Sequence, residues 1–306
     1  MKRAPTMEQR KRRAILLSMS VALLLLVTKA VIALASNSLA LLASALDSLL
    51  DFFSSSINYL SIRIADKPAD NDHHFGHGKA EGLAGLFQGL FIIVSAAALV
   101  YAAVQRLFNQ EKLQQIPLGV GMMVISIVIT LWLVRRLREA AVKTESITLK
   151  GDALHYATDT ITNGGVLIAL ILIKLTGLVM IDPIVSILIT LYILWGAGRL
   201  LKEALDELMD KALPRSYQEE VEKIIKSYQP HLTGCHDFRS RRSGSRKLIE
   251  FHIEVDRAKS FEEAHELAES LRLAIENRIP NSHITIHYDP AGYEDRRATL
   301  EQTLKG

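Results

Sequence analysis

Cysteine is nearly absent from this 306-residue chain, in which Cys235 is the only one. A single cysteine excludes an intrachain disulfide framework and a zinc finger with four cysteine ligands. An excess of charge of one sign is also lacking, because 36 Lys and Arg stand against 33 Asp and Glu. This near balance gives no case for a nucleic-acid partner. A bound metal would therefore have to rest on His, Asp and Glu.

Two catalytic signatures are missing from the sequence as well. It has no Walker A loop ending in Gly-Lys-Ser or Gly-Lys-Thr and no His-Glu-x-x-His motif. Neither ATP hydrolysis nor intramembrane zinc proteolysis is therefore supported. We expect no enzymatic activity and no cofactor.

Long apolar runs are present, and they are unevenly distributed. Residues up to about 205 carry runs of Ala, Val, Ile and Leu, whereas residues 212–306 carry closely spaced charges. A helix needs about 20 apolar residues to cross a bilayer core of about 30 Å. We therefore predict an α-helical membrane protein with a basic N-terminal segment at 1–13 and a transmembrane domain at 14–211. Its six predicted spans lie at about 14–35, 38–64, 83–108, 117–134, 154–173 and 181–201.

The distribution of Lys and Arg between the loops predicts the orientation. Fourteen of these residues lie in the N-terminal segment and in the loops after the second and fourth spans, against three in the opposite loops, Arg106, Lys112 and Lys174. Because positive loops stay in the cytoplasm, both termini are expected there. The free Cys235 would then remain reduced.

The charged C-terminal part predicts a small α+β domain at 212–292, followed by a tail at 293–306. The signals are, in order, helical spacing at 216–228, alternation at 247–256, a capping box at Ser260 and Glu263, and alternation again at 283–289. The order helix, strand, strand, helix, strand favours a three-stranded sheet with both helices on one face. The other face would be open to a metal or to a second copy of the chain.

Two of the predicted spans each carry a pair of ionisable side chains four residues apart, whereas Lys29 in the first span lies close enough to an interface to snorkel and is given no role. Asp47 and Asp51 lie midway along the second span, and His155 and Asp159 lie near the start of the fifth. A separation of four residues puts both side chains of a pair on one face of a helix, so two packed helices would bring four ligands to one point. A charge at the bilayer centre costs about 3 kcal/mol or more, so these residues need a reason.

Three carboxylates and one imidazole suit a divalent cation in tetrahedral geometry. Zinc is the first candidate, with ferrous iron or cadmium as alternatives. For any one of these residues taken alone, a hydrogen bond in helix packing is the competing interpretation.

The loop after the second span predicts a further metal site. Asp70, His73 and His77 have the spacing of three ligands on a short turn. A polar loop with exposed histidines is the alternative.

Histidines also gather in the C-terminal domain. His287 and Asp289 share a strand face, and His252 lies on the polar face of its own strand, so these side chains can converge. His236 and His265 are further candidates. The alternative is a set of surface histidines on a soluble domain.

Taken with these residues, the chain resembles the cation diffusion facilitator family and, within it, the bacterial ferrous-iron/zinc efflux pumps. The resemblance spans about 14–292. It implies a homodimer in the bacterial cytoplasmic (inner) membrane, with six spans per subunit and a cytoplasmic domain similar to a metallochaperone. The motifs that carry it are DSLLD from Asp47, PADNDHHFGHGKAE from Pro68, DALHYATD from Asp152, DP at Asp182, LMDKALP from Leu208 and IHYDP ending at Pro290.

The same resemblance assigns roles to individual residues. Lys79 and Asp210 match a charge interlock between the two domains across the dimer, and Tyr288 stands where relatives in the family place Gln. The implied metal ligands are Asp47, Asp51, His155 and Asp159 in a transport site, Asp70, His73 and His77 in a loop site, and His236, His252, His287 and Asp289 in a binuclear cytoplasmic site with His265 as a further ligand.

The expected function is export of a divalent metal, with zinc as the first choice, in exchange for protons and by alternating access. Metal ligands must be deprotonated, so metal and protons exclude each other at one site. Because histidine titrates near pH ~6.5, His155 would carry protons together with Asp51. Metal bound by the C-terminal domain would be regulatory or structural.

Two other functions remain open at this point. A membrane metal sensor that does not transport needs ligands only in its soluble part, so acids on two facing helices favour a transport pathway. A downhill channel is the second, but four strong ligands would hold zinc too tightly for rapid flux.

Overall fold

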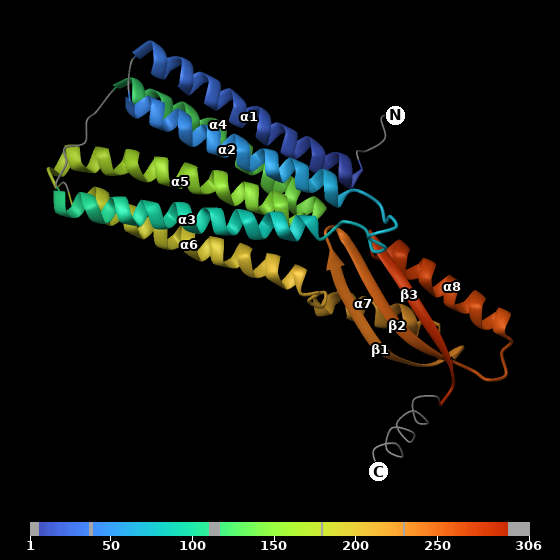
Figure 1. The fold of residues 1–306 in the computed structure, drawn as a ribbon. Helices are drawn as coiled ribbons and strands as arrows, with labels where there is room; N and C mark the ends of the chain where they lie inside the picture. The colour runs from blue at the N-terminus through green and yellow to red at the C-terminus, as the bar shows by residue number, and fades with distance from the viewer. Residues whose placement is uncertain (1–5, 37–38, 110–116, 179, 229, 293–306) are drawn as a thin grey trace. The chain divides into compact units, whose positions relative to one another are not determined.

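The computed structural model of the protein describes residues 6–36, 39–109, 117–178, 180–228 and 230–292 (Figure 1). The chain divides into two compact units, Met1–Leu208 and Met209–Gly306. This division lies close to the predicted boundary between residues 211 and 212. Predictions for residues 1–5, for Lys112 and for the tail at 293–306 fall outside the described residues.

Six long helices make up the first unit, as the apolar runs predict. Within the described residues, five of them, α1 and α3 to α6, are long and apolar enough to cross a membrane. Helix α2, which carries Asp47 and Asp51, is not among these five. The helices extend beyond the apolar runs because polar turns continue them at their ends. Their bounds are α1 Met7–Ser36, α2 Leu39–Ala65, α3 Ala80–Asn109, α4 Pro117–Thr144, α5 Ile147–Thr176 and α6 Ile181–Leu208.

Helix α5 lies at the centre of this unit and contacts every other long helix. In Figure 1 it lies between α1, α2 and α4 on one side and α3 and α6 on the other. Its residues Leu149 and Tyr156 belong to an apolar core shared with α1, α2 and α4, whereas Ile147 belongs to a second core shared with α3 and α6. Side chains on α5 are therefore held from both sides.

Glycines allow α3 to approach its neighbours closely. A Cβ added at Gly89 would lie 3.2 Å from Leu201 Cδ1 of α6, and one at Gly85 would lie 3.4 Å from Ala204 Cβ. Small residues at such contacts let helix backbones pack tightly where no hydrophobic effect drives association. The α3 and α6 helices thereby form one packed pair.

The second unit has the predicted order of helix, strand, strand, helix, strand. The sheet order is β1-β2-β3, with β1 and β2 antiparallel and β2 and β3 parallel. The elements are α7 Arg215–Lys226, β1 Leu232–Ser243, β2 Arg246–Val255, α8 Phe261–Arg278 and β3 Ser282–Pro290.

Alternation in the central strand places the two helices on one face of the sheet. Phe251 and Ile253 of β2 are buried in one core with Val221 of α7 and Leu271 of α8. Helix α8 begins at the predicted capping box, in which the Ser260 side chain accepts from the Glu263 backbone N–H and the Glu263 side chain accepts from the Ser260 N–H. The prediction of helices on one face is confirmed, and the other face of the sheet carries the histidines.

Candidate metal centres

The structure brings together three of the four side chains predicted to form the transport site. Asp51 comes from α2, and His155 and Asp159 come from α5, one turn apart. His155 Nε2 lies 3.0 Å from Asp51 Oδ1 and 3.8 Å from Asp159 Oδ2. One ligand atom from each residue lies within 4.8 Å of the others. The group is oxygen- and nitrogen-rich, as a divalent cation requires.

Asp47 lies outside this tight group but lines the same cavity of about 410 Å³. The cavity also contains Lys29 of α1, to which the sequence pattern gives no role because it lies near the end of the first span. Lys29 Nζ donates to Ser48 Oγ at 2.8 Å, so the ammonium group points toward α2. Three carboxylates and one lysine therefore face a single cavity, together with His155.

A second buried polar group lies one turn of α5 before His155, and sequence reasoning missed it. Asp152 is fully buried, and its Oδ1 accepts hydrogen bonds from Ser55 Oγ at 3.3 Å and Asn58 Nδ2 at 3.1 Å. Within the described residues, Asp152 Oδ2, Asn58 Oδ1 and Gln88 Nε2 have no hydrogen-bond partner. The spacing along α2 could have indicated this group, because Ser55 and Asn58 lie on the same helix face as Asp47 and Asp51.

A buried ion pair at the start of α1 was also missed. Lys11 Nζ lies 2.6 Å from Glu81 Oε1 and 3.6 Å from Asp66 Oδ1, and the side chains of Lys11 and Glu81 are 2% and 0% exposed. Ser146, the N-cap of α5, donates to the second Glu81 oxygen. Lys11 is therefore not a freely solvated charge of the basic segment 1–13, because α1 already begins at Met7. We call Lys11, Asp66, Glu81 and Ser146 the Lys11–Glu81 cluster.

The loop between α2 and α3 brings its three predicted ligands together. Asp70 Oδ1 lies 3.4 Å from His73 Nδ1, and Asp70 Oδ2 lies 3.4 Å from His77 Nε2. Gly76 has φ +78°, a left-handed conformation that favours glycine, and it turns the chain between the two histidines. The backbone N–H of His73 donates to Asp70 at 2.8 Å and holds the pKa of this carboxyl below its ordinary value. The carboxylate is thus ionised and available to a cation.

Three histidines form a row across the sheet of the second unit. His236 in β1 is the register partner of His252 in β2, which is the partner of His287 in β3. Neighbouring rings have centroids 5.2 and 4.6 Å apart. Asp289 contacts all three, with Oδ2 2.9 Å from His252 Nδ1 and 3.5 Å from His236 Nε2, and with Oδ1 3.3 Å from His287 Nε2. The strand register therefore brings the three histidines together around one carboxylate.

The remaining candidates of this unit lie away from the row. His265 is exposed on α8, where Glu269 is a charged neighbour, and it is not part of the ligand group formed by His236, His252 and Asp289. Tyr288 packs on the helix side, with its ring centroid 5.8 Å from that of Phe261. Its side chain thus lies on the face opposite His287 and Asp289, as strand alternation requires.

Cys235 precedes His236 in β1, and alternation directs it to the other face of the strand. Partial burial of the thiol and the nearby Glu222 carboxylate of α7 raise the pKa of Cys235 to about 11. The thiolate is therefore scarce at neutral pH, and only the thiolate binds metal well. A metal held by the histidine row would therefore be bound by nitrogen and oxygen ligands, without the sulfur of Cys235.

The two residues of the expected charge interlock belong to different units, and each has contacts within its own. Lys79 Nζ donates to the backbone oxygen of Leu208 at 3.3 Å, and Asp210 Oδ2 lies 3.2 Å from Arg241 Nη1. The pairing of Lys79 with Asp210 stays a prediction.

Family models match both units. The model for the cation efflux transmembrane domain matches residues 15–209, and the model for the cytoplasmic domain of cation efflux proteins matches residues 213–291. The chain belongs to the cation efflux family. Because this family consists of membrane transporters, the protein is a multi-pass membrane protein that moves cations. The resemblance inferred from the motifs is confirmed, and so is the architecture of a helical transmembrane domain followed by an α+β domain.

Individual relatives cover most of the chain. The cation-efflux pump FieF of Serratia proteamaculans is 38% identical over 279 residues, covering 91% of this chain and 92% of the relative. FieF of Salmonella arizonae is 37% identical over 284 residues, covering 93% and 94%.

Solved structures that cover about a quarter of this chain are also similar to it. The metal-bound C-terminal domain of the CzcD transporter from Thermotoga maritima is 30% identical, covers 26% of this chain and 96% of its own, and has a TM-score of 0.25. A cytosolic domain of a cation diffusion facilitator family protein is also 30% identical, covers 26% and 99%, and has a TM-score of 0.24.

Proposed function

We propose that this protein exports zinc from the cytoplasm across the bacterial inner membrane in exchange for protons. The group of Asp51, His155 and Asp159 between two helices of the transmembrane domain carries this proposal. Asp47, which faces the same cavity, supplies a fourth ligand when its side chain turns toward the group. Four nitrogen and oxygen ligands suit tetrahedral zinc, with ferrous iron and cadmium as alternative cargo.

Proton exchange follows from the charge of the cavity. Up to three carboxylates face one Lys29 ammonium in surroundings of low dielectric constant, so an empty site must take up protons or another cation. Metal and protons compete because the ligands bind metal only when deprotonated. Asp51 and His155, whose side chains lie 3.0 Å apart, are the residues that exchange one for the other. Rocking of the helices around α5 would open the site to each side in turn.

The other metal groups and the assembly have supporting roles. Asp70 with His73 and His77 would collect metal at the cytoplasmic entrance. The histidine row around Asp289 would hold one or two metal ions, because it offers three imidazoles and a carboxylate as ligands. A homodimer with cytoplasmic termini fits the match of the second unit to the family's cytoplasmic domain. The Lys79–Asp210 interlock would link the two domains in that dimer.

Reconstitution in liposomes tests the proposal directly. Zinc flux and lumenal pH are recorded together for the wild type, for Asp51→Ala and for Glu139→Gln. Glu139 is a matched control, because it is an exposed carboxylate of α4 that lies 3.8 Å from Arg136, outside the site. We expect coupled zinc and proton movement in the wild type and in Glu139→Gln, and neither in Asp51→Ala.

Two results would overturn the proposal. Zinc flux that is independent of the pH gradient would indicate a channel. Zinc binding by the histidine row without any flux would indicate a sensor.

A further inference from the structure

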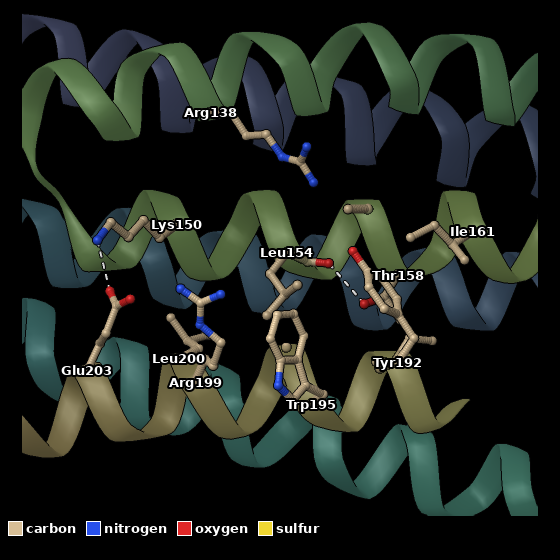
Figure 2. A pocket seen from close by; sticks show the side chains of 13 residues that line it. Arg138, Lys150, Leu154, Thr158, Ile161, Tyr192, Trp195, Arg199, Leu200 and Glu203 are labelled. Atoms are coloured by element: carbon tan, nitrogen blue, oxygen red, sulfur yellow. Dashed lines mark hydrogen bonds and ion pairs between the residues drawn. The ribbon is translucent and has the colours of Figure 1, made fainter. Parts of the chain in front are cut away.

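A groove on the outside of the transmembrane domain has no part in the proposed metal pathway. It lies where α4, α5 and α6 meet and has a volume of about 220 Å³ (Figure 2). Its lining changes character along its length. Figure 2 shows Lys150, Arg199 and Glu203 toward one end, which we call the basic end, Ile161 and Tyr192 toward the other, and Arg138 opposite Leu154 and Trp195 between them.

The charges at the basic end do not cancel. Lys150 Nζ and Glu203 Oε2 pair at 2.8 Å. Among the described residues, neither Arg138 nor Arg199 has an acidic partner, and the Arg199 guanidinium carbon lies 5.0 Å from the Trp195 ring centroid. Figure 2 shows Arg138 pointing from α4 toward α5 and Arg199 pointing toward α5 from α6. Two guanidinium groups from different helices thus converge on the same opening, which suits one anion.

The depth of this opening matches the headgroup level of a bilayer. Arg138 is close to the end of α4, Lys150 to the start of α5, and Glu203 to the end of α6, so the basic end lies at one mouth of the helix bundle. Trp195 and Tyr192 follow toward the bilayer centre and are 60% and 57% exposed. Long basic side chains take such positions at a membrane interface, and the two aromatic side chains continue the groove into the hydrocarbon layer.

We propose that this groove binds an anionic phospholipid. Its phosphate would accept hydrogen bonds from Arg138 and Arg199, and an acyl chain would lie against Leu154, Ile161 and the Trp195 ring. A soluble anion would leave the apolar half of the groove unused, whereas basic pockets between transmembrane helices are a known setting for anionic headgroups. The net positive charge of the basic end opposes binding of a metal cation.

The two tryptophans of the chain, Trp132 and Trp195, make the test specific. In Trp132→Phe, the fluorescence comes only from Trp195 inside the groove. The variant is reconstituted in phosphatidylcholine vesicles that contain increasing fractions of either dibrominated phosphatidylglycerol or dibrominated phosphatidylcholine, and bromine quenches the indole on contact. Expressing the data as quenched over unquenched intensity removes any change in brightness that a substitution causes.

We expect phosphatidylglycerol to bind in the groove about 5-fold to 30-fold more strongly than phosphatidylcholine. Attraction of the anionic headgroup to one or two basic side chains accounts for a preference of this size. Adding Arg138→Gln and Arg199→Gln to Trp132→Phe should remove this preference. Quenching by brominated phosphatidylcholine should stay unchanged, and this unchanged quenching shows that the variant is still folded in the bilayer. Arg136→Gln is the matched control, because Arg136 of α4 contacts the Trp132 ring instead of the groove. It should keep the preference.

Equal quenching by the two lipids in Trp132→Phe would overturn the proposal, as would a preference that survives loss of both arginines. Added inorganic phosphate that displaces the brominated phosphatidylglycerol would assign the site to a soluble anion and would overturn it as well.

Discussion

The Lys11–Glu81 cluster should be a main source of stability for the transmembrane domain. Lys11 and Glu81 come from α1 and α3, Asp66 follows α2, and Ser146 caps α5, so one group of charges joins four helices. The pair at 2.6 Å is almost completely shielded from water. Removing one member of a buried pair leaves an uncompensated charge and costs about 3–5 kcal/mol.

Single substitutions should therefore be costly, and their costs should differ. Glu81→Ala leaves Lys11 with Asp66 at 3.6 Å, so we expect a loss of about 3 kcal/mol in the free energy of unfolding. Lys11→Met leaves the Glu81 carboxylate with no positive partner at 2.6 Å, although Ser146 still donates to it, so the loss should lie nearer 5 kcal/mol.

The double variant Lys11→Met/Glu81→Leu removes both charges at once. Asp66 keeps its contact with Arg12 at 3.4 Å, and the lost bond from Ser146 costs about 1 kcal/mol, so the double variant should be far closer to the wild type than either single variant. With losses of about 3 and about 5 kcal/mol for the single variants and about 1 kcal/mol for the double variant, the coupling energy of the cycle is about 7 kcal/mol in magnitude.

Unfolding in mixed micelles with increasing dodecyl sulfate, followed by tryptophan fluorescence, measures these differences. The exposed pair of Lys150 and Glu203 at 2.8 Å is the matched control, because its geometry is similar and its side chains are 42% and 43% exposed. Glu203→Ala should cost at most about 1 kcal/mol. Equal costs for Glu81→Ala and Glu203→Ala, or a double variant as unstable as the single variants, would refute the assignment of stability to the buried cluster.

Three further predictions concern other parts of the protein. Asp152→Leu should lower the free energy of unfolding in the same micelle assay by about 2–4 kcal/mol, because two buried donors lose their acceptor; a loss under 1 kcal/mol would contradict this. Zinc at about 100 times its dissociation constant should stabilise the second unit by about 2.7 kcal/mol, measured by calorimetry with and without chelator. His252→Ala should abolish that gain, and His265→Ala, whose imidazole lies outside the ligand group, should retain it. Ser260→Ala should cost α8 about 1 kcal/mol in thermal unfolding. Capping also depends on pH, because the backbone N–H of Ser260 holds the pKa of Glu263 below its ordinary value. The stabilisation from the Glu263 carboxylate is therefore fully present above the ordinary carboxyl pKa. It is lost as the pH falls through the lowered pKa of Glu263 in the folded protein. An unchanged cost of Glu263→Gln at pH 7 and pH 3 would contradict that reasoning.

Much of the fold was predictable because local rules determine it. The apolar runs predict the long helices, and the capping box at Ser260 and Glu263 predicts where α8 begins. Alternation predicts that Phe251 and Ile253 face the helices while His252 faces away. The same alternation makes the row of histidines recognisable once the strand register is known.

The meeting of three candidate ligands in the transmembrane domain was predictable for a similar reason. His155 and Asp159 share a helix face by spacing alone, and their meeting with Asp51 requires only that α2 and α5 pack together. Spacing along the sequence does not predict which distant residue a single buried charge pairs with. Lys11 and Glu81 are 70 residues apart, and nothing local in either segment indicates that they meet.

The contrast between these two buried groups indicates how one helical bundle can hold both structural and transported charge. In the Lys11–Glu81 cluster, Lys11 and Arg12 face Glu81 and Asp66, so positive and negative charges are equal in number and the group needs nothing from outside. In the cavity beside α5, three carboxylates face a single lysine, and the imidazole of His155 is neutral unless protonated. A buried deficit of positive charge persists only if a cation or protons fill it in every state of the protein. The first arrangement needs no added ion, whereas the second requires a cation or protons at all times, and this requirement is what the proposed exchange of metal for protons would use.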